Sequence, residues 1–221
     1  MFPLSDSIKA NRFPFLNYIL IAITVFVFIQ QLGNPDGIIA SYALIPAKVV
    51  LGDFTTFLPF ITAIFLHGGF LHIISNMWFL KVFGDNVEGV LNPLAFLLLY
   101  FIAGIAGNVV QFLFMSNSAI PMLGASGAVA GILGCYLILF PHAKIKTLLF
   151  IFFFVTITRI SATFMLGYWF LLQIISAIGS IPEMGNQGGV AFFAHVAGFV
   201  VGIIFGKIYK SKAQSYEVHY E

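Results

Sequence analysis

The chain has 221 residues, of which 60% are hydrophobic and only 8% are charged. Soluble domains carry roughly 25% charged residues, so this composition excludes a water-soluble globular protein. The net charge of +2 excludes a basic surface for nucleic acid, and the single cysteine, Cys135, excludes an internal disulfide. The sequence therefore predicts an integral membrane protein with a single domain.

Six apolar runs, separated by Gly, Pro and polar residues, predict six membrane-crossing helices. A helix needs about 20 apolar residues to cross a bilayer, and several of the runs approach that length. The predicted crossings are 15–31, 70–87, 94–115, 126–140, 162–179 and 191–209. The expected fold is an all-α bundle of six transmembrane helices, with a long outward loop at 32–66.

A further apolar stretch, KTLLFIFFFVTITR at 146–159, lies between the fourth and fifth predicted crossings. It offers about a dozen apolar residues between basic ends, too few for a crossing, so we expect an interfacial or re-entrant segment. The chain as a whole is expected to divide into a cytoplasmic N-terminal segment (1–14), the six-helix domain (15–209) and a cytoplasmic C-terminal tail (210–221).

Basic residues gather on one side of the predicted bundle. With six crossings, that side receives Lys9, Arg12, Lys81, Lys144, Lys146, Arg159, Lys207, Lys210 and Lys212. The opposite side receives only Lys48. Since cytoplasmic loops are rich in Lys and Arg, both chain termini are expected on the cytoplasmic side.

Polar side chains at membrane depth are costly and usually functional, and several of them occur around the start of the second predicted helix. The segment HGGFLHIISNM contains His67, His72 and Asn76. His72 and Asn76 are four residues apart, so they share one helix face. His67 precedes the helix, and we expect it at the outer interface rather than in catalysis.

The fourth predicted helix opens with Ser126, in the segment GASGAVAGILG, followed by Gly127, Gly131 and Gly134. Small residues at this spacing usually serve close helix packing, and packing alone would account for the run. A serine at a helix start is also a candidate nucleophile, because the unpaired backbone N–H groups there can bind an oxyanion.

The sixth predicted helix carries a second stripe of small residues, Gly198, Gly202 and Gly206, with His195 at its outer end. Packing of this stripe on the glycines that follow Ser126 would bring the serine hydroxyl near the imidazole. In this interpretation the glycines position two polar groups that react. Such a pair below the outer surface requires a protein-covered, water-filled cavity.

Together these motifs resemble the rhomboid family of intramembrane serine proteases over most of the chain. The segments that carry the resemblance are HGGFLHIISNM, FGDNVE, GASG and AHVAGFVVG. The resemblance implies Ser126 as nucleophile, His195 as general base and an acyl-enzyme intermediate. It implies an oxyanion hole formed by His72, Asn76 and the backbone N–H of Ser126. No acidic residue lies on the His195 stripe, so we expect packing to orient the base.

The resemblance also assigns roles outside this pair. Glu88 corresponds to a structural glutamate at the inner end of the second helix. Trp169 and Phe170 lie on the helix that admits substrate in this family, and the glycine-rich loop 180–190 corresponds to a cap over the site. Helix-packing support is expected from Gly127, Gly131, Gly198 and Gly202.

Two positions depart from the family pattern. Leu58 and Pro59, in FLPF at 57–60, stand where many members have a Trp-Arg pair before the His motif. Ala130 stands where many members have a tyrosine that packs on the histidine. We therefore expect the outer loop and the His195 ring to be held in a different way.

The expected function is cleavage of transmembrane segments near the outer face of the membrane, without a cofactor or metal. The expected partners are the lipid bilayer and transmembrane-helix substrates, and the expected location is a prokaryotic inner membrane, with the site opening to the extracytoplasmic side. The alternative is a rhomboid-like binder of transmembrane helices that does not cut them. A metal site is disfavoured because no His-Glu-x-x-His pattern occurs.

Overall fold

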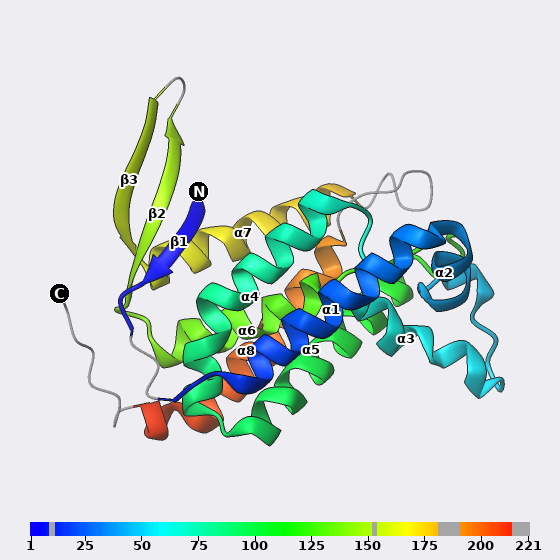
Figure 1. Ribbon diagram of the computed structural model, residues 1–221, viewed down its shortest axis with the longest axis horizontal. Helices are drawn as coiled ribbons and strands as arrows, with labels where there is room; N and C mark the ends of the chain where they lie inside the picture. Colours follow the sequence, from blue (N-terminus) through cyan, green and yellow to red (C-terminus); the bar gives the residue numbers. More distant parts are fainter. Residues whose placement is uncertain (9–11, 152–153, 181–190, 214–221) are drawn as a thin grey trace.

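The structure is a computed structural model that describes residues 1–8, 12–151, 154–180 and 191–213. Six helices of 14 to 22 residues pack together in the described chain (Figure 1). They are α1 (Phe15–Gly33), α4 (Phe70–Val90), α5 (Pro93–Phe114), α6 (Ser126–Leu139), α7 (Ala162–Ser180) and α8 (Phe192–Ala213). Each agrees with a predicted crossing to within a few residues. The largest difference is in α8, which continues past residue 209 into the predicted tail.

Four of these helices, α1, α5, α7 and α8, are long and apolar enough to cross a membrane. A fifth candidate span is the pair Phe54–Phe65 and Phe70–Val90, which is bent by 79°. α6 has 14 residues, and its side chains from Gly127 to Tyr136 are all buried. The described chain is thus a mostly helical membrane protein with four or five candidate spans.

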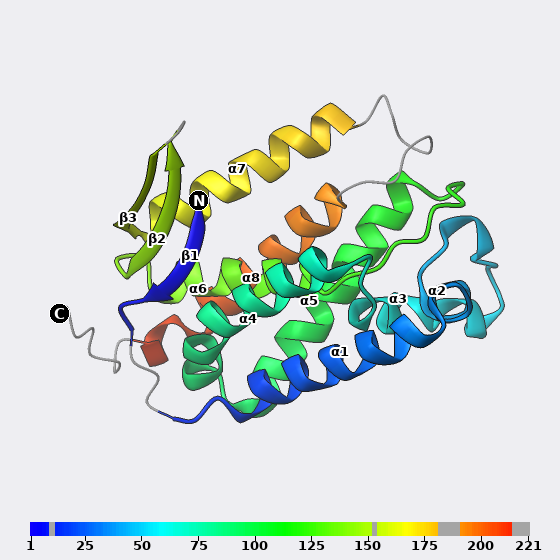
Figure 2. The same ribbon diagram turned by 45° about the horizontal axis from the view of Figure 1, so that its top comes forward.

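α6 is the central helix of the bundle, in contact with α4, α5, α7 and α8 (Figure 2). Its glycines allow the closest approach to α8. A Cβ atom at Gly198 would collide with the carbonyl oxygen of Gly127, and one at Gly202 with that of Gly131. This register makes α6 and α8 parallel, so the two helices begin on the same side of the bundle.

Glu88 joins the end of α4 to the start of α1. Its carboxylate accepts hydrogen bonds from the backbone N–H groups of Leu16 (3.0 Å) and Asn17 (2.7 Å). These N–H groups belong to the first turn of α1 and have no partner within the helix. The Asn17 amide in turn donates to the Leu80 carbonyl (3.1 Å). Glu88 therefore contributes to helix packing, away from the cavity described below.

The segment between α1 and α4 is built from short helices: α2 (Pro35–Tyr42), η1 (Pro46–Lys48), η2 (Phe54–Phe57), α3 (Pro59–Thr62) and η3 (Ala63–Phe65). Pro59 begins α3, and Phe60 packs between the rings of Phe57 (5.9 Å between centroids) and Phe112 (5.6 Å). The Asn108 amide donates to the Phe60 carbonyl (2.8 Å). An aromatic cluster and a buried asparagine thus hold the loop where the family pattern has a Trp-Arg pair.

The prediction of an all-α fold is confirmed only in part, because a small sheet accompanies the helices. Strands β1 (Phe2–Asp6), β2 (Lys144–Ile151) and β3 (Phe154–Ser161) form an antiparallel sheet in the order β1-β2-β3. The stretch expected to be interfacial or re-entrant is the β2–β3 hairpin, which projects from the bundle beside the start of α7 (Figure 1). Its many Ile, Thr, Val and Phe residues favour strands, a preference that a count of apolar length does not detect.

Strand β1 lies within the predicted N-terminal segment (1–14) and packs against the helical bundle. The Trp78 indole of α4 donates to the Pro3 carbonyl (2.6 Å) and stacks on Phe2 (5.6 Å between centroids). At the other end of β1, the Asp6 carboxylate accepts from the Asn86 amide (2.8 Å) and from the Tyr136 hydroxyl. Residues 1–6 therefore pack against α4 and α6.

Candidate active site

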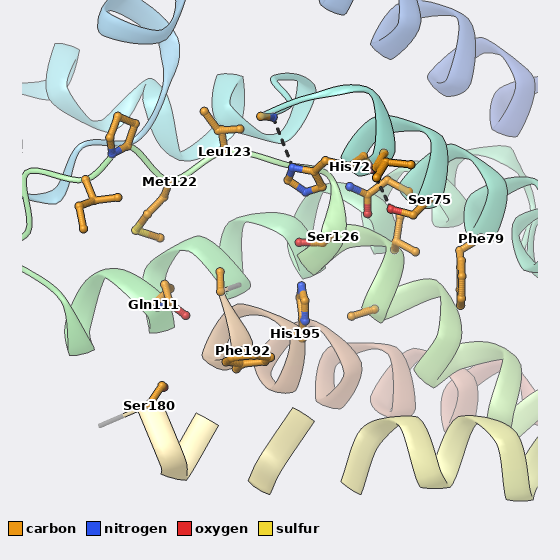
Figure 3. A pocket seen from close by; sticks show the side chains of 18 of the residues that line it. His72, Ser75, Phe79, Gln111, Met122, Leu123, Ser126, Ser180, Phe192 and His195 are labelled. Atoms are coloured by element: carbon orange, nitrogen blue, oxygen red, sulfur yellow. Dashed lines mark hydrogen bonds between the residues drawn. The ribbon is translucent and has the colours of Figure 1, made fainter. Parts of the chain in front are cut away.

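A cavity of about 910 Å³ opens between α4, α6 and α8. The predicted nucleophile, the predicted base and both predicted oxyanion-hole side chains line it, namely Ser126, His195, His72 and Asn76. In Figure 3 the side chains of Ser126 and His195 point toward one another across the cavity. The structure thus brings together residues from three helices that are far apart in the sequence.

Ser126 is the first residue of α6, preceded by a sharp turn at Gly124. Gly124 has φ of +134°, a left-handed conformation that strongly favours glycine. A Cβ atom there would lie 2.8 Å from the His72 ring, so the turn can approach this ring only because residue 124 has no side chain. The N–H groups of the first turn of α6, whose partial positive charge favours an anion, are oriented by this turn.

His195 lies in the first turn of α8 and is only 8% exposed. Its ring lies 5.8 Å from the Trp169 ring and 6.5 Å from the Phe192 ring, between centroids. Its Nδ1 is 2.7 Å from Oε1 of Gln173, on α7. The expectation that packing alone orients the base is therefore wrong, since a side-chain hydrogen bond does so as well.

Gln173 is the contact that sequence reasoning missed. Its amide stands alone in an apolar helix, and a buried amide at membrane depth is a signal of a functional partner. Nothing in the local sequence, however, indicates that this amide faces His195, because the two residues belong to different helices.

The polar groups of α4 face the same cavity. The backbone N–H of Gly68 donates to Nδ1 of His72 (3.3 Å), so the proton of a neutral His72 ring is on Nε2, the nitrogen close to Gly124. Asn76 is 6% exposed, and its Nδ2 is buried without a hydrogen-bond partner in the protein. Two donors are thus available beside Ser126.

His67, which we expected outside catalysis, is fully buried in the protein. Its backbone is held by Gln31, which accepts from the His67 N–H (3.1 Å) and donates to its carbonyl (2.6 Å). Its ring nitrogen Nε2 accepts from the backbone N–H of Ala125, at 3.5 Å. His67 therefore supports the turn before Ser126 and does not line the cavity.

The two predicted gate residues lie on α7 and face α8. Trp169 lines the cavity and contacts His195, whereas Phe170 stacks on Phe199 with 4.2 Å between ring centroids. Of the predicted cap loop, 180–190, the first residue ends α7, and residues 181–190 lie outside the described part of the chain. Among the residues that are described, no group of three or more His, Cys, Asp or Glu side chains could hold a metal ion.

The fold and the cavity define a helical membrane protein in which a serine at a helix start faces a buried histidine. The family model of the rhomboid domain matches residues 55–212, which is more than half of the chain. The chain therefore belongs to the rhomboid family.

Three curated relatives illustrate the similarity. Rhomboid protein 1, mitochondrial, from Saccharomyces cerevisiae is 33% identical over 203 residues, which cover 90% of this chain and 54% of that protein. Rhomboid protease GluP from Bacillus subtilis is 31% identical over 205 residues, 89% of this chain and 38% of that protein. RHOMBOID-like protein 6, mitochondrial, from Arabidopsis thaliana is 32% identical over 155 residues, 70% of this chain and 44% of that protein.

The chain spans about half, or less, of the length of these relatives. Their names include mitochondrial proteins as well as a bacterial one, so they give no support to our expectation of a prokaryotic inner membrane.

Proposed function

We propose that this protein is an intramembrane serine endopeptidase in which Ser126 is the nucleophile and His195 is the general base. The observation that carries the proposal is the cavity in which Ser126, at the start of α6, faces the buried His195 ring. Membership of the rhomboid family, and the similarity to a Bacillus subtilis protein named as a protease, support this class of activity.

In the proposed reaction, Nε2 of His195 takes the proton of the Ser126 hydroxyl as its oxygen attacks the scissile carbonyl carbon. The carbonyl oxygen becomes an oxyanion that accepts hydrogen bonds from His72 Nε2–H, the Asn76 amide and the Ser126 backbone N–H. His195 then gives the proton to the leaving amine, and an acyl-enzyme remains. A water molecule, deprotonated by His195, hydrolyses this ester and restores the Ser126 hydroxyl.

The proposed substrates are transmembrane segments of other membrane proteins. A stable helix holds its carbonyl groups in internal hydrogen bonds, so small or helix-breaking residues near the scissile bond should favour cleavage. With six crossings and both termini in the cytoplasm, the starts of α6 and α8 would face the extracytoplasmic side. Cleavage would then occur near the outer end of the substrate helix.

The test is cleavage of a reporter transmembrane substrate by the purified protein in liposomes. Ser126→Ala and His195→Ala are each expected to lower kcat by about a thousandfold or more, and the double variant no further, because the pair acts as a unit. Ser116→Ala, which alters an exposed serine, should leave cleavage unchanged. Retained cleavage by Ser126→Ala would contradict the proposal.

The alternative, a non-proteolytic binder of transmembrane helices, gives a different result in the same assay. The wild type and Ser126→Ala would crosslink to the reporter equally, and neither would cleave it. A serine-reactive fluorophosphonate probe would also leave Ser126 unlabelled, because no base would activate the hydroxyl.

A further inference from the structure

Gln173 of α7 contacts the candidate general base from the side opposite to Ser126. We propose that Gln173 is a positioning residue, whose amide holds His195 in the tautomer and orientation that leave Nε2 free to accept the serine proton. The catalytic consequence rests on the proposed function, whereas the tautomer is a property of the folded protein and can be measured in the absence of any activity.

The hydrogen bond between the two side chains is short and buried. Nδ1 of His195 lies 2.7 Å from Oε1 of Gln173, and the two residues are 8% and 9% exposed. Water cannot readily replace a partner at such a site, so the loss of the amide would leave a buried polar group unpaired. The contact is therefore expected to have a strong effect on the tautomer and the orientation of the His195 ring.

The orientation of the Gln173 amide determines which atom faces His195. Its Nε2 donates to the Trp169 carbonyl, one turn earlier in α7, at 3.4 Å. This bond leaves Oε1 directed at the ring, and a carbonyl oxygen can only accept a hydrogen bond. Nδ1 of His195 must therefore carry the proton.

A neutral imidazole has one N–H, so a proton on Nδ1 leaves a lone pair on Nε2. Figure 3 shows the two ring nitrogens of His195 on opposite sides, one of them toward Ser126. The Gln173 bond thus selects the form of the ring that can act as a base toward the hydroxyl. This is the task that an aspartate performs in a Ser-His-Asp triad, carried out here by an uncharged group.

An amide suits this position because it adds no charge to an apolar part of the protein. A buried carboxylate would lose its hydration and would require further donors. Among the described residues, the polar side chains that share the cavity with His195 or contact its ring include His72 and Asn76 from α4, Gln111 from α5, Ser126 from α6 and Gln173 from α7. Of these side chains, His72 is the other histidine.

Two of the contacts that hold the ring, from Gln173 and Trp169, come from α7, whereas His195 belongs to α8. Trp169 packs on the ring at 32° between planes, one helical turn from Gln173. A movement of α7 away from α8 would therefore remove the hydrogen bond and the ring contact together. The hydrogen bond that selects the tautomer would exist only while these two helices are packed at this point.

The first experiment measures the tautomer by nitrogen NMR of protein that contains isotope-labelled histidine. The His195 signals are identified by their absence from His195→Ala. The wild type should have a protonated Nδ1 and an unprotonated Nε2 at a pH where the ring is neutral, and Gln173→Leu should give a mixture of tautomers. An unprotonated Nδ1 in the wild type would overturn the proposal, and this outcome does not depend on cleavage.

The second experiment compares kinetic constants for the reporter substrate. Gln173→Leu should lower kcat about tenfold to a hundredfold, because it leaves the Nδ1–H unpaired, with KM changed less than about twofold. The rate of labelling by a fluorophosphonate probe, which needs no transmembrane substrate, should fall in parallel. Gln30→Leu, the same change at an exposed position of α1, is the control and should alter neither.

Gln173→Glu distinguishes positioning from a merely structural role. A carboxylate preserves the acceptor, so kcat should recover relative to Gln173→Leu. It also favours the protonated ring, so the acid limb of the kcat/KM profile should move up by about one pH unit or more. If Gln173→Glu is as impaired as Gln173→Leu and the acid limb does not move, the role is structural and the proposal is wrong. If the wild type neither cleaves nor reacts with the probe, the proposed function fails, and the NMR measurement alone decides the role of Gln173.

Discussion

At the scale of single residues, the polar atoms of the site differ in whether they have a hydrogen-bond partner in the protein. Nδ1 of His195 forms a hydrogen bond with the Gln173 side chain, and Nδ1 of His72 accepts a hydrogen bond from the backbone N–H of Gly68. Nδ2 of Asn76 is the exception, since it is buried and has no partner in the protein. An unpaired buried donor costs about 1–3 kcal/mol, and a substrate oxyanion would supply the missing acceptor.

We therefore predict that Asn76→Ala lowers kcat about a hundredfold to a thousandfold, the usual effect of losing one oxyanion donor. The free energy of unfolding of this variant should be unchanged or slightly higher, because Nδ2 of Asn76 makes no hydrogen bond in the protein that the substitution could remove. Reporter cleavage and unfolding by denaturing detergent measure the two quantities.

Asn108→Ala is the matched control, because its amide donates to the Phe60 carbonyl outside the cavity. This variant should lose about 1 kcal/mol of stability with little effect on kcat. If Asn76→Ala instead loses stability and retains kcat, Asn76 has a structural role and the prediction is wrong.

At the scale of the elements, the site depends on the distance between α6 and α8. Gly198 faces Gly127, and Gly202 faces Gly131, with no room for a side chain between the backbones. Because Ser126 and His195 lie at the starts of the same two helices, this backbone contact also sets the separation of the two side chains.

We predict that Gly202→Ala destabilises the protein by about 1–3 kcal/mol or more, through overpacking against Gly131, and lowers kcat by increasing the helix separation. Gly167→Ala in α7 is the control, since a Cβ atom there would meet nothing within 4 Å. Detergent unfolding and reporter cleavage give the comparison. Equal stability of the two variants would show that the close approach of α6 and α8 is not required.

Strand β1 should be held more firmly at low pH than at high pH. Burial raises the pKa of Asp6 from 3.8 to about 6, although the hydrogen bonds from Tyr136 and Asn86 oppose the shift. A raised carboxyl pKa means that the folded state prefers the protonated form. Stability from this group is therefore fully present below pH 3.8 and is lost as the pH rises through about 6.

The measurement is amide hydrogen exchange in β1 and β2 across this pH range, corrected for the intrinsic rate. Protection should fall as the pH rises, and Asp6→Asn, which cannot ionise, should weaken the dependence. A pH-independent protection in the wild type would contradict the assignment of the titration to Asp6.

At the scale of the whole molecule, β1, the base of the hairpin and the end of α8 lie at one end of the bundle, and α2 and α3 lie at the other (Figure 1). The first end carries the basic residues Lys144, Lys146, Arg159, Lys207, Lys210 and Lys212. The positive-inside rule therefore predicts that the hairpin end faces the cytoplasm.

This orientation can be tested with single cysteines in a Cys135→Ala background and a thiol reagent that does not cross membranes. A cysteine replacing Val155 in β3, where the side chain is 61% exposed, should react only from the cytoplasmic side. A cysteine replacing Phe54, which is 88% exposed at the other end, should react only from the outer side. The reverse pattern would contradict the orientation and the proposed outward cleavage site.

Much of the helical framework could be predicted from the sequence, because apolar length and helix breakers are local signals. All six helices were predicted within a few residues, and so was the meeting of the two glycine-rich faces. The sheet could not be predicted in this way. Apolar length does not separate a strand from an interfacial segment, and β1 is a strand only because β2, more than 130 residues later, supplies its partner.

Composition, apolar run length and motif spacing were enough to predict a membrane protein, the approximate ends of its helices, and the serine and histidine that are candidates for a reactive pair. The surroundings of that pair are known from the folded bundle alone. Gln173 contacts His195, Gly124 lies beside the His72 ring, and His67 is buried in the interior. Composition and hydrophobic periodicity are properties of a single segment and can be read from its residues. A buried hydrogen bond, in contrast, joins atoms from segments that meet only when the chain has folded.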